Sequence, residues 1–353
     1  MNLVLIIDYL IISIIASMAI NSLLRNLAIK NRLFVDIPDK NRKLHKLTTP
    51  VTGGVGIIIA LLLSGKLYVD LNNLNGYVPS FTYQLAICSI ALVCFFLIDD
   101  LKGLKASKRL IAQTLLSLYM IYETGIVLEN LGDLFGFGDI KLGIFSYPFT
   151  IFCVVGIMNA FNMIDGINGL CSGSAMLSLL LIGFASGLIY DSFLILVIGS
   201  IIGFLIFNLS IFGSDRGVFL GDHGSNLVGF WVAWTAIYAS QNSMYVIEPI
   251  TIIWFVAIPL LDCIGLLVSR ILKGLSWATP GRDHIHHKLM NKFSSLSSLM
   301  ILLFVSLIVG ILGIYLQNNY PIWISTLLFL LFSLVYYCFA YRIEIKTLLS
   351  KNV

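Results

Sequence analysis

Four short polar segments carry most of the side chains that could do chemistry in this 353-residue chain. They hold two adjacent carboxylates at 99–100, amides and an acid at 159–169, a Gly-Asp-His-Gly-Ser sequence at 221–225, and three histidines at 284–287. Carboxylates bind Mg²⁺ together with phosphate oxygens, and backbone N–H groups at a helix start attract phosphate. If the fold brings them together, these groups would support phosphoryl transfer with a divalent cation.

The acids can be interpreted in two ways. Asp99 and Asp100 end an apolar run, where carboxylates are costly unless they are solvated, paired or bound to a cation. A solvated helix end beside Lys102 is therefore the alternative to a metal site. Asp222 could add a further metal ligand at a phosphate-binding helix start, but Ser225 could equally be only a helix N-cap.

The amides and histidines also leave two interpretations open. Asn159 and Asn162 share a helix face and suit hydrogen bonds to a nucleobase or sugar, although they could simply cap and turn the helix. His284, His286 and His287 suit a diphosphate or nucleotide, the alternative being a solvated basic loop. Zinc is disfavoured, because the His-Glu-x-x-His spacing is absent and no cysteine is nearby.

Two further positions stay ambiguous. Asp262 lies within an apolar run, so it is either a functional acid or the structural partner of a basic group. Lys43, His45 and Lys46 belong to a basic loop that could grip a phosphate or only anchor the chain at the membrane surface.

Long apolar runs separate these polar segments. The chain is 58% hydrophobic and 11% charged, with a mean hydropathy of +0.95, whereas a soluble domain carries about 25% charged residues. A soluble fold is therefore excluded. A helix of about 20 residues crosses the hydrocarbon core, so we predict an all-α polytopic membrane bundle of eleven transmembrane helices, at about 3–24, 51–66, 82–98, 110–128, 147–161, 172–190, 193–212, 226–240, 249–269, 297–316 and 322–341.

The basic residues orient this bundle. Of the 22 lysines and arginines, 20 fall in alternate loops, and only Lys66 and Lys141 fall on the other side. Basic loops stay cytoplasmic, which predicts an outer N-terminus, an inner C-terminus and a cytoplasmic position for all four polar segments. The first run is too long for a signal-peptide core and is expected to be retained. The six cysteines have no paired spacing, so disulfides and cysteine metal sites are not expected. We expect residues 1–353 to form one transmembrane domain.

Several motifs, in one order along the chain, resemble those of the polyprenyl-phosphate N-acetylhexosamine-1-phosphate transferase family, of the glycosyltransferase 4 type. They are Asp36-x-Pro-x-x-x-Arg42-Lys-x-His45, Gly53-Gly54, Asp99-Asp100, Asn159-Ala-Phe-Asn-Met-Ile-Asp165-Gly, Phe219-Leu-Gly-Asp222-x-Gly-Ser225, Ile258-Pro-Leu-Leu-Asp262 and Arg282-Asp-His-Ile-His-His287. The His-Ile-His-His form resembles the branch of WecA-type undecaprenyl-phosphate N-acetylglucosamine-1-phosphate transferases.

The resemblance implies transfer of N-acetylhexosamine 1-phosphate, foremost that of N-acetylglucosamine, from a UDP-sugar to undecaprenyl phosphate, with release of UMP. It implies a Mg²⁺ or Mn²⁺ cofactor, a place in the bacterial inner membrane, a role at the first lipid-linked step of envelope polysaccharide synthesis, no nucleic-acid partner, and a homodimer as one possible assembly. A sister enzyme for another UDP-amino sugar (a quinovosamine, fucosamine or muramoyl-pentapeptide type) is the alternative, and an ion-coupled transporter is a remote one.

The resemblance also implies roles for individual residues. Two positions depart from the family pattern: Asn168 replaces a second acid, and His223 stands where a small residue is frequent. These two departures affect the prediction of the sugar more than the prediction of the reaction type. Two mechanisms stay open, namely direct attack by the lipid phosphate and a covalent aspartyl-phosphate route. We expect catalysis to depend on Asp99, Asp100, Asp165, His284, His286 and His287, substrate binding on Lys43, His45, Lys46, Asn159, Asn162, Asn168 and Arg282, and metal binding on Asp222 with Asp99 or Asp100.

Overall fold

The computed structural model describes residues 3–37, 47–72, 79–245, 247–276 and 283–341, and these are predominantly helical. Every predicted apolar run corresponds to a helix, and the run at 249–269 is divided between two. The α-helices are α1 (Leu3–Asn31), α2 (Gly53–Leu71), α3 (Ser80–Lys102), α4 (Ala106–Thr124), α5 (Ser146–Ile164), α6 (Leu170–Ser186), α7 (Ser192–Asn208), α8 (Asp222–Gln241), α9 (Pro249–Phe255), α10 (Ala257–Leu272), α11 (Ile285–Met290), α12 (Ser295–Asn319) and α13 (Ile322–Ala340).

The lengths and compositions of these helices identify a membrane protein. Six helices of the described chain are long and apolar enough to cross a bilayer, namely α1, α2, α3, α5 with the turn before it, α12 and α13. Together α9 and α10 would make a seventh span, although an 82° bend separates them. The apolar helices α6 and α7 are shorter, and α4 and α8 contain more polar residues. The all-α membrane fold is confirmed, while eleven spans and their orientation stay predictions.

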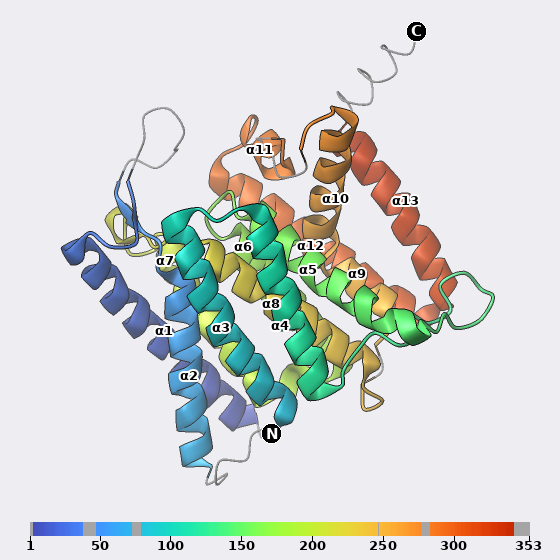
Figure 1. Cartoon of the computed structure of the whole chain (residues 1–353), viewed down its shortest axis with the longest axis horizontal. Coiled ribbons are helices and arrows are strands. Elements are labelled where there is room, and N and C mark those ends of the chain that lie inside the picture. The colour runs from blue at the N-terminus through green and yellow to red at the C-terminus, as the bar shows by residue number, and fades with distance from the viewer. Residues whose placement is uncertain (1–2, 38–46, 73–78, 246, 277–282, 342–353) are drawn as a thin grey trace.

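Helix α8 forms the centre of the bundle and contacts α2, α3, α5 and α6 (Figure 1). Its aromatic residues Phe230, Trp231 and Trp234 are fully buried. The indole N–H of Trp231 donates to Ser89 Oγ on α3 at 2.8 Å. A helix that is buried around its whole circumference is mostly apolar on every face, and residues 227–239 of α8 are so, apart from Thr235 and Tyr238. Its polar start contacts α2, α3, α4 and α5.

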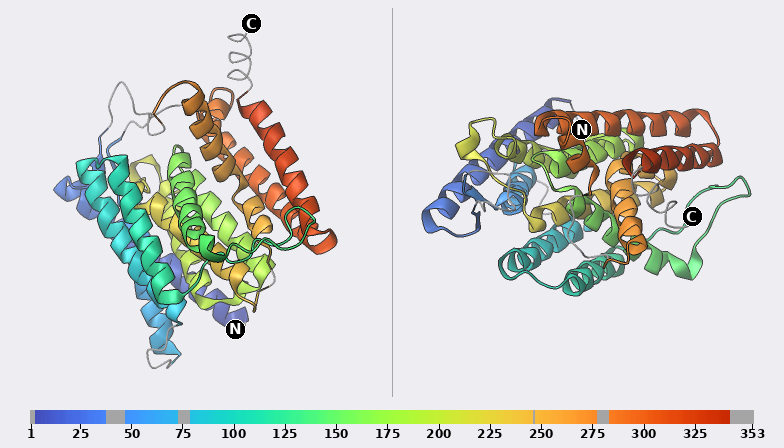
Figure 2. Two further views of the ribbon diagram at one scale, coloured as in Figure 1. Left: turned by 45° about the vertical axis from the view of Figure 1, so that its right-hand side comes forward. Right: turned by 90° about the horizontal axis from the view of Figure 1, so that it is seen from above.

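The turned views in Figure 2 show two flanks around this centre. Helices α12 and α13 run side by side on one flank, and α3 and α4 pack together on another. Helix α1 packs closely on α7, where Ser13 and Ser17 donate to the carbonyl oxygens of Leu196 and Ser200 at 2.6 and 2.7 Å. Small residues allow such close helix contacts in membranes.

The bend between α9 and α10 has a local cause. Pro259 lies in the first turn of α10, and it lacks the N–H that would bond to the carbonyl of Phe255 in a continuous helix. The freed carbonyl oxygen of Phe255 instead accepts from Ser178 Oγ on α6 at 2.9 Å. The bend therefore leaves no unsatisfied group at Phe255, and it sets the direction of α10, which carries Asp262.

The polar helix ends gather at one edge of the molecule, at the top of Figure 1. Two short antiparallel strands, β1 (Val35–Asp36) and β2 (Thr49–Pro50), lie there. The start of α2 is joined to the segment before α8, since the N–H groups of Gly53 and Gly54 donate to the carbonyls of Phe219 and Leu220 at 3.0 and 3.1 Å. This edge also holds the α3–α4 turn and α11, so it assembles the predicted site segments.

Candidate active site

The turn between α3 and α4 is built around Asp99. The N–H of Gly103, which has φ +62°, donates to the carbonyl of Asp99 at 2.7 Å. The buried carboxylate of Asp99 accepts from the N–H of Leu104 at 2.7 Å, and its other oxygen lies 2.7 Å from Nε of Arg109. Both carboxylate oxygens are thus engaged in holding the turn and the arginine.

Arg109 joins two acids from distant segments. While its Nε contacts Asp99, its Nη1 lies 3.3 Å from Oδ2 of Asp222. A guanidinium presents its N–H groups in a fixed plane, so one side chain can hold two carboxylates. Composition places Arg109 only among the basic loop residues. In the sequence it shares the first turn of the helix after Asp99 with Lys108, so nothing there distinguishes it.

Asp222 begins α8 and also contacts α5. Its Oδ1 accepts from Nδ2 of Asn162 at 3.2 Å, and the same amide donates to Ser225 Oγ at 2.9 Å. The predicted amide of α5 and the predicted acid of α8 therefore lie together. Asn162 uses its N–H groups within the protein, so its carbonyl oxygen is the atom that stays available to a substrate.

Asp100 is held by a histidine. Its Oδ2 lies 2.5 Å from Nδ1 of His223, whose ring is fully buried. The ring occupies a narrow slot: a Cβ added at Gly54 would lie 2.6 Å from its Cδ2, and one added at Gly221 would lie 2.5 Å from its Cε1. The unusual residue at position 223 thus contacts a predicted catalytic acid directly.

Asp165, just after α5, completes a group of three acids. Its side chain reaches solvent. The pKa of its carboxyl is nevertheless raised to about 7, first by desolvation and then by the negative charges of Asp222 and Asp100. Two acids that destabilise the ionised form of a third mark a place where a cation would be stabilised. The name acid group is used below for Asp100, Asp165 and Asp222.

A chain of amides supports the acid group from below. Asn159 donates to Oε1 of Gln113 at 2.8 Å, and Gln113 donates to Oδ1 of Asn226 at 2.7 Å. Asn226 in turn donates to the carbonyl of Asp222 at 2.8 Å. Asn159, which was expected to bind substrate, thus lies in a structural network that fixes the start of α8. Gln113 and Asn226 carry no motif that would identify them from the sequence.

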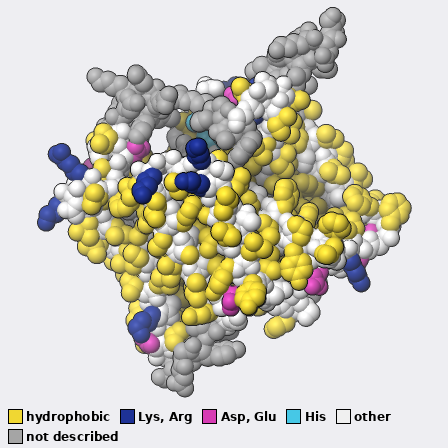
Figure 3. All heavy atoms as spheres, in the orientation of Figure 1, with side chains coloured by type: hydrophobic (Ala, Val, Ile, Leu, Met, Phe, Trp, Pro, Cys, Tyr) yellow, Lys and Arg dark blue, Asp and Glu magenta, His cyan; other side chains and the backbone are white. Residues whose placement is uncertain are grey.

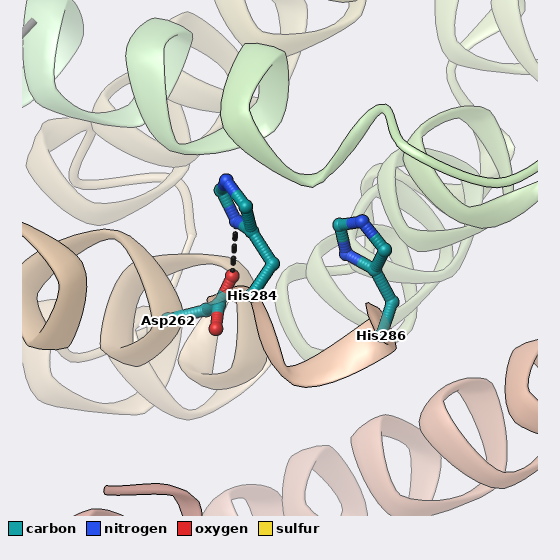
Figure 4. A group of neighbouring side chains, drawn as sticks. All are labelled: Asp262, His284 and His286. Carbon is teal, nitrogen blue, oxygen red and sulfur yellow. Dashed lines mark hydrogen bonds and ion pairs between the residues drawn. The ribbon is translucent and has the colours of Figure 1, made fainter. Parts of the chain in front are cut away.

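Asp262 fixes the histidine segment (Figure 4). Its Oδ2 lies 2.9 Å from Nδ1 of His284, and its Oδ1 accepts from the N–H of Ile285 at 2.9 Å. Tyr336 on α13 donates to the same Oδ1 at 3.4 Å. The structure places the Asp262 carboxylate against an imidazole of the histidine segment. Asp262 therefore orients His284 and the start of α11.

The three histidine rings lie against one another beside the acid group, with His284 and His286 stacked and His287 tilted against them. The ring centroids of His284 and His286 are 5.1 Å apart, and those of His286 and His287 are 4.2 Å apart. Burial, and then the neighbouring His287 and His284, lower the pKa of His286 to about 3. A Cβ at Gly166 would overlap the ring of His286. Since Gly166 follows Asp165, the histidines adjoin the acids.

The surface over this edge is basic and hollowed. Lysine and arginine side chains gather along it, and a histidine side chain is visible at the bottom of a hollow (Figure 3). Asn168 is exposed in the turn between α5 and α6. The expected substrate-binding residues Lys43, His45, Lys46 and Arg282 lie outside the described residues.

Comparisons with known proteins identify the family of the chain. Residues 52–240 match the family described as Glycosyl transferase family 4. The chain is 34% identical to an undecaprenyl-phosphate alpha-N-acetylglucosaminyl 1-phosphate transferase of Yersinia pestis, over 96% of this chain and 92% of that protein. Proteins of the same name from Escherichia coli O157:H7 and Haemophilus influenzae are each 32% identical, over 84% and 86% of this chain and 81% and 85% of their own lengths.

Proposed function

Because the chain belongs to glycosyl transferase family 4, we propose that it transfers N-acetylglucosamine 1-phosphate from UDP-N-acetylglucosamine to undecaprenyl phosphate. The products are undecaprenyl-diphosphate-N-acetylglucosamine and UMP, and the reaction opens the lipid-linked part of envelope polysaccharide synthesis. The relatives are named for this acceptor and this sugar phosphate. The observation that carries the proposal is the meeting of the acid group with Arg109 at one edge of a membrane bundle.

The acid group suits a hard divalent cation. Mg²⁺ and Mn²⁺ prefer carboxylate and phosphate oxygens, and Asp100 and Asp222 offer such oxygens beside Asp165. Asp99 suits a metal less well, because a backbone N–H and Arg109 engage its oxygens. When bound, the cation would neutralise the diphosphate and stabilise the departing UMP.

The reaction exchanges one phosphorus–oxygen bond for another. An oxygen of the lipid phosphate attacks the β-phosphorus of the UDP-sugar, and the bond from that phosphorus to the UMP oxygen breaks. Arg109, which contacts Asp222, adds positive charge where these anions meet. Asp165 has a pKa of about 7 and can accept a proton from the lipid phosphate. Labelled phosphosugar retained on the enzyme without lipid would favour the rival covalent route.

The histidines would bind the donor. His286 has no hydrogen-bond partner for either ring nitrogen among the described residues, and His287 stands beside it. Imidazoles can donate to or accept from phosphate and sugar oxygens. The carbonyl of Asn162 and the exposed Asn168 would face the uridine or the sugar. The remaining expected contacts to the phosphates come from Lys43, His45, Lys46 and Arg282.

The protein would work in the bacterial inner membrane with this edge toward the cytoplasm. The excess of lysine and arginine in alternate loops supports that orientation, and the UDP-sugar is a cytosolic substrate. Eleven membrane crossings with an outer N-terminus and an inner C-terminus belong to the same proposal, as does assembly into a homodimer.

One experiment tests the proposal directly. Purified protein is incubated with undecaprenyl phosphate, Mg²⁺ and a panel of UDP-amino sugars, and the lipid products and UMP are identified by mass spectrometry. We expect the diphosphate lipid of N-acetylglucosamine. If the only lipid product carries another sugar, the proposed donor is wrong and the UDP form of that sugar takes its place. Ion flux in liposomes without UMP release would favour a transporter.

Two controls test the acid group in that assay. EDTA should stop the transfer, and Mg²⁺ or Mn²⁺ should restore it. Asp222→Ala should abolish the transfer while the protein stays folded in the membrane. Turnover without any divalent cation, or near-normal turnover of the variant, would contradict the role given to these acids.

A further inference from the structure

A second group of potential metal ligands lies behind the acid group. Asp262, His284 and His286 each offer one ligand atom, and these atoms all lie within 4.8 Å of one another. All three residues are buried, and within the described part of the chain they are the only such group of histidine, cysteine or acidic side chains. Figure 4 shows the two imidazole rings side by side, with the Asp262 carboxylate against His284.

His286 is the member of this group that lacks a partner. Its side chain is 1% exposed, and neither ring nitrogen has a hydrogen-bond partner in the described chain. A buried polar group without a partner is destabilising, so a ligand that accepts the lone pair of one ring nitrogen would stabilise this position. Gly166 borders this ring, where a Cβ would overlap Nε2 of His286.

Asp262 and His284 are already oriented as ligands. The backbone N–H of Ile285 and the hydroxyl of Tyr336 hold Oδ1 of Asp262, at 2.9 and 3.4 Å. The hydroxyl of Tyr341 donates to the Asp262 carbonyl at 3.2 Å. These hydrogen bonds fix the direction of the Asp262 carboxylate, and its contact with Nδ1 fixes the His284 ring beside it.

We propose that Asp262, His284 and His286 bind one transition-metal ion of the Zn²⁺ class, separate from the cation of the acid group. Two imidazoles and one carboxylate suit zinc-like ions, whereas Mg²⁺ requires oxygen ligands. Ligand atoms around tetrahedral Zn²⁺ are about 3.4 Å apart. The largest separation here, 4.8 Å, has to shrink by about 1.4 Å. A rotation of His286 supplies this contraction, because no hydrogen bond holds its ring.

The ion would compete with the sugar donor, and this consequence rests on the proposed function. A metal on His286 takes the nitrogen that the proposed function gives to the diphosphate. Zn²⁺ should therefore raise the KM for the UDP-sugar and leave kcat unchanged at saturating donor. Metal binding itself does not depend on transferase activity, so the two claims can fail separately.

Cobalt absorption spectroscopy tests the site. The full-length protein, in detergent and with any histidine tag removed, is titrated with Co²⁺. We expect the visible absorption band of four-coordinate Co²⁺, saturating at one ion per chain. Zn²⁺ should abolish the band by displacement, and an excess of Mg²⁺ should leave it. The variants His286→Ala and His284→Ala should lose the band, and Asp262→Asn should weaken Co²⁺ binding, because it replaces a charged carboxylate ligand by a neutral amide.

Matched variants separate this metal site from the acid group and from other buried histidines. His223→Ala removes a buried histidine outside the site, and Asp222→Asn removes a ligand of the acid group; both should keep the band. Unchanged gel-filtration profiles and metal-free melting temperatures establish that the variants are folded. A wild type without the band, a band retained in His286→Ala, or a band abolished by Mg²⁺ overturns the proposal. A band in a protein without transferase activity supports the metal site and contradicts the proposed function.

Discussion

Nδ1 of His223 lies 2.5 Å from Oδ2 of Asp100, although 123 positions separate the two residues in the chain. The ring is enclosed between Gly54 and Gly221, so it cannot turn away from the carboxylate. His223 thereby limits the directions in which Asp100 can present its second oxygen. A residue that departs from the family pattern thus acts on one of the acids that the family motif contains.

Removing this imidazole should slow the reaction. A hydrogen bond to a charged group contributes about 1.5–3 kcal/mol, so we expect His223→Ala to lower kcat by about 10- to 100-fold, with a smaller change in KM. Steady-state kinetics over a range of UDP-sugar concentrations measure this split. Asp100→Asn should lose less activity in the His223→Ala background than in the wild type, because the two residues act together. Additive losses would contradict the pairing.

Activity should fall when the bridge that Arg109 forms between Asp99 and Asp222 is broken. Arg109→Gln removes the contacts to Asp99 and Asp222, and misplacing Asp222 should lower kcat roughly 100-fold. Asp99→Asn should give a smaller loss alone, and little further loss in the Arg109→Gln background. The exposed Lys108 on the same helix turn is the matched control. Loss of activity in Lys108→Gln equal to that in Arg109→Gln would show a general charge effect.

The contact of α2 with α8 should not tolerate a methyl group. In Gly54→Ala the new Cβ would lie 2.5 Å from Cα of Gly224 and 2.6 Å from the His223 ring. Backbone atoms cannot yield as a side-chain end can, so we expect a loss of about 1–3 kcal/mol of stability, measured as a lower melting temperature in detergent. Gly65→Ala in the same helix meets nothing within 4 Å and should be neutral or stabilising.

Asp165 should make stability depend on pH. Its pKa is about 7, against an ordinary value of 3.8, so the folded protein holds this proton more tightly than the unfolded chain does. The resulting stability is fully present below about pH 4 and is lost as the pH rises through 7. In EDTA the melting temperature should fall between pH 5 and 8, and this part of the fall should be absent in Asp165→Asn. The same dependence of melting temperature on pH in the wild type and in Asp165→Asn would contradict this role of Asp165.

The sequence predicts the helices and the shared edge well, because both follow from long apolar runs and from basic loops. Each predicted run is helical over most of its length, and the acid group lies beside the histidines as their alternate placement requires. Both the apolar runs and the exclusion of charge from hydrocarbon can be recognised from the order of residues along the chain. They need no knowledge of which helices touch.

The partners inside the site could not be predicted in this way. Arg109 and Gln113 lie on α4 among other polar residues. Only the packing of α4 beside α5 and α8 brings these two into contact with the site residues. Asp99 and Asp100 are neighbours in the chain, yet one holds a turn and the other faces His223. Adjacent residues of a helix point about 100° apart, but which acid meets Arg109 and which meets His223 depends on how α3 packs against α4 and α8.

The bend at Pro259 has a consequence for motion. Straightening α9 and α10 into one rod would break the bond from Ser178 to the Phe255 carbonyl, and the proline ring could offer no N–H in exchange. The 82° angle is therefore a static part of the architecture and not a hinge. We therefore expect α10 to keep its direction during turnover, and Asp262 with it.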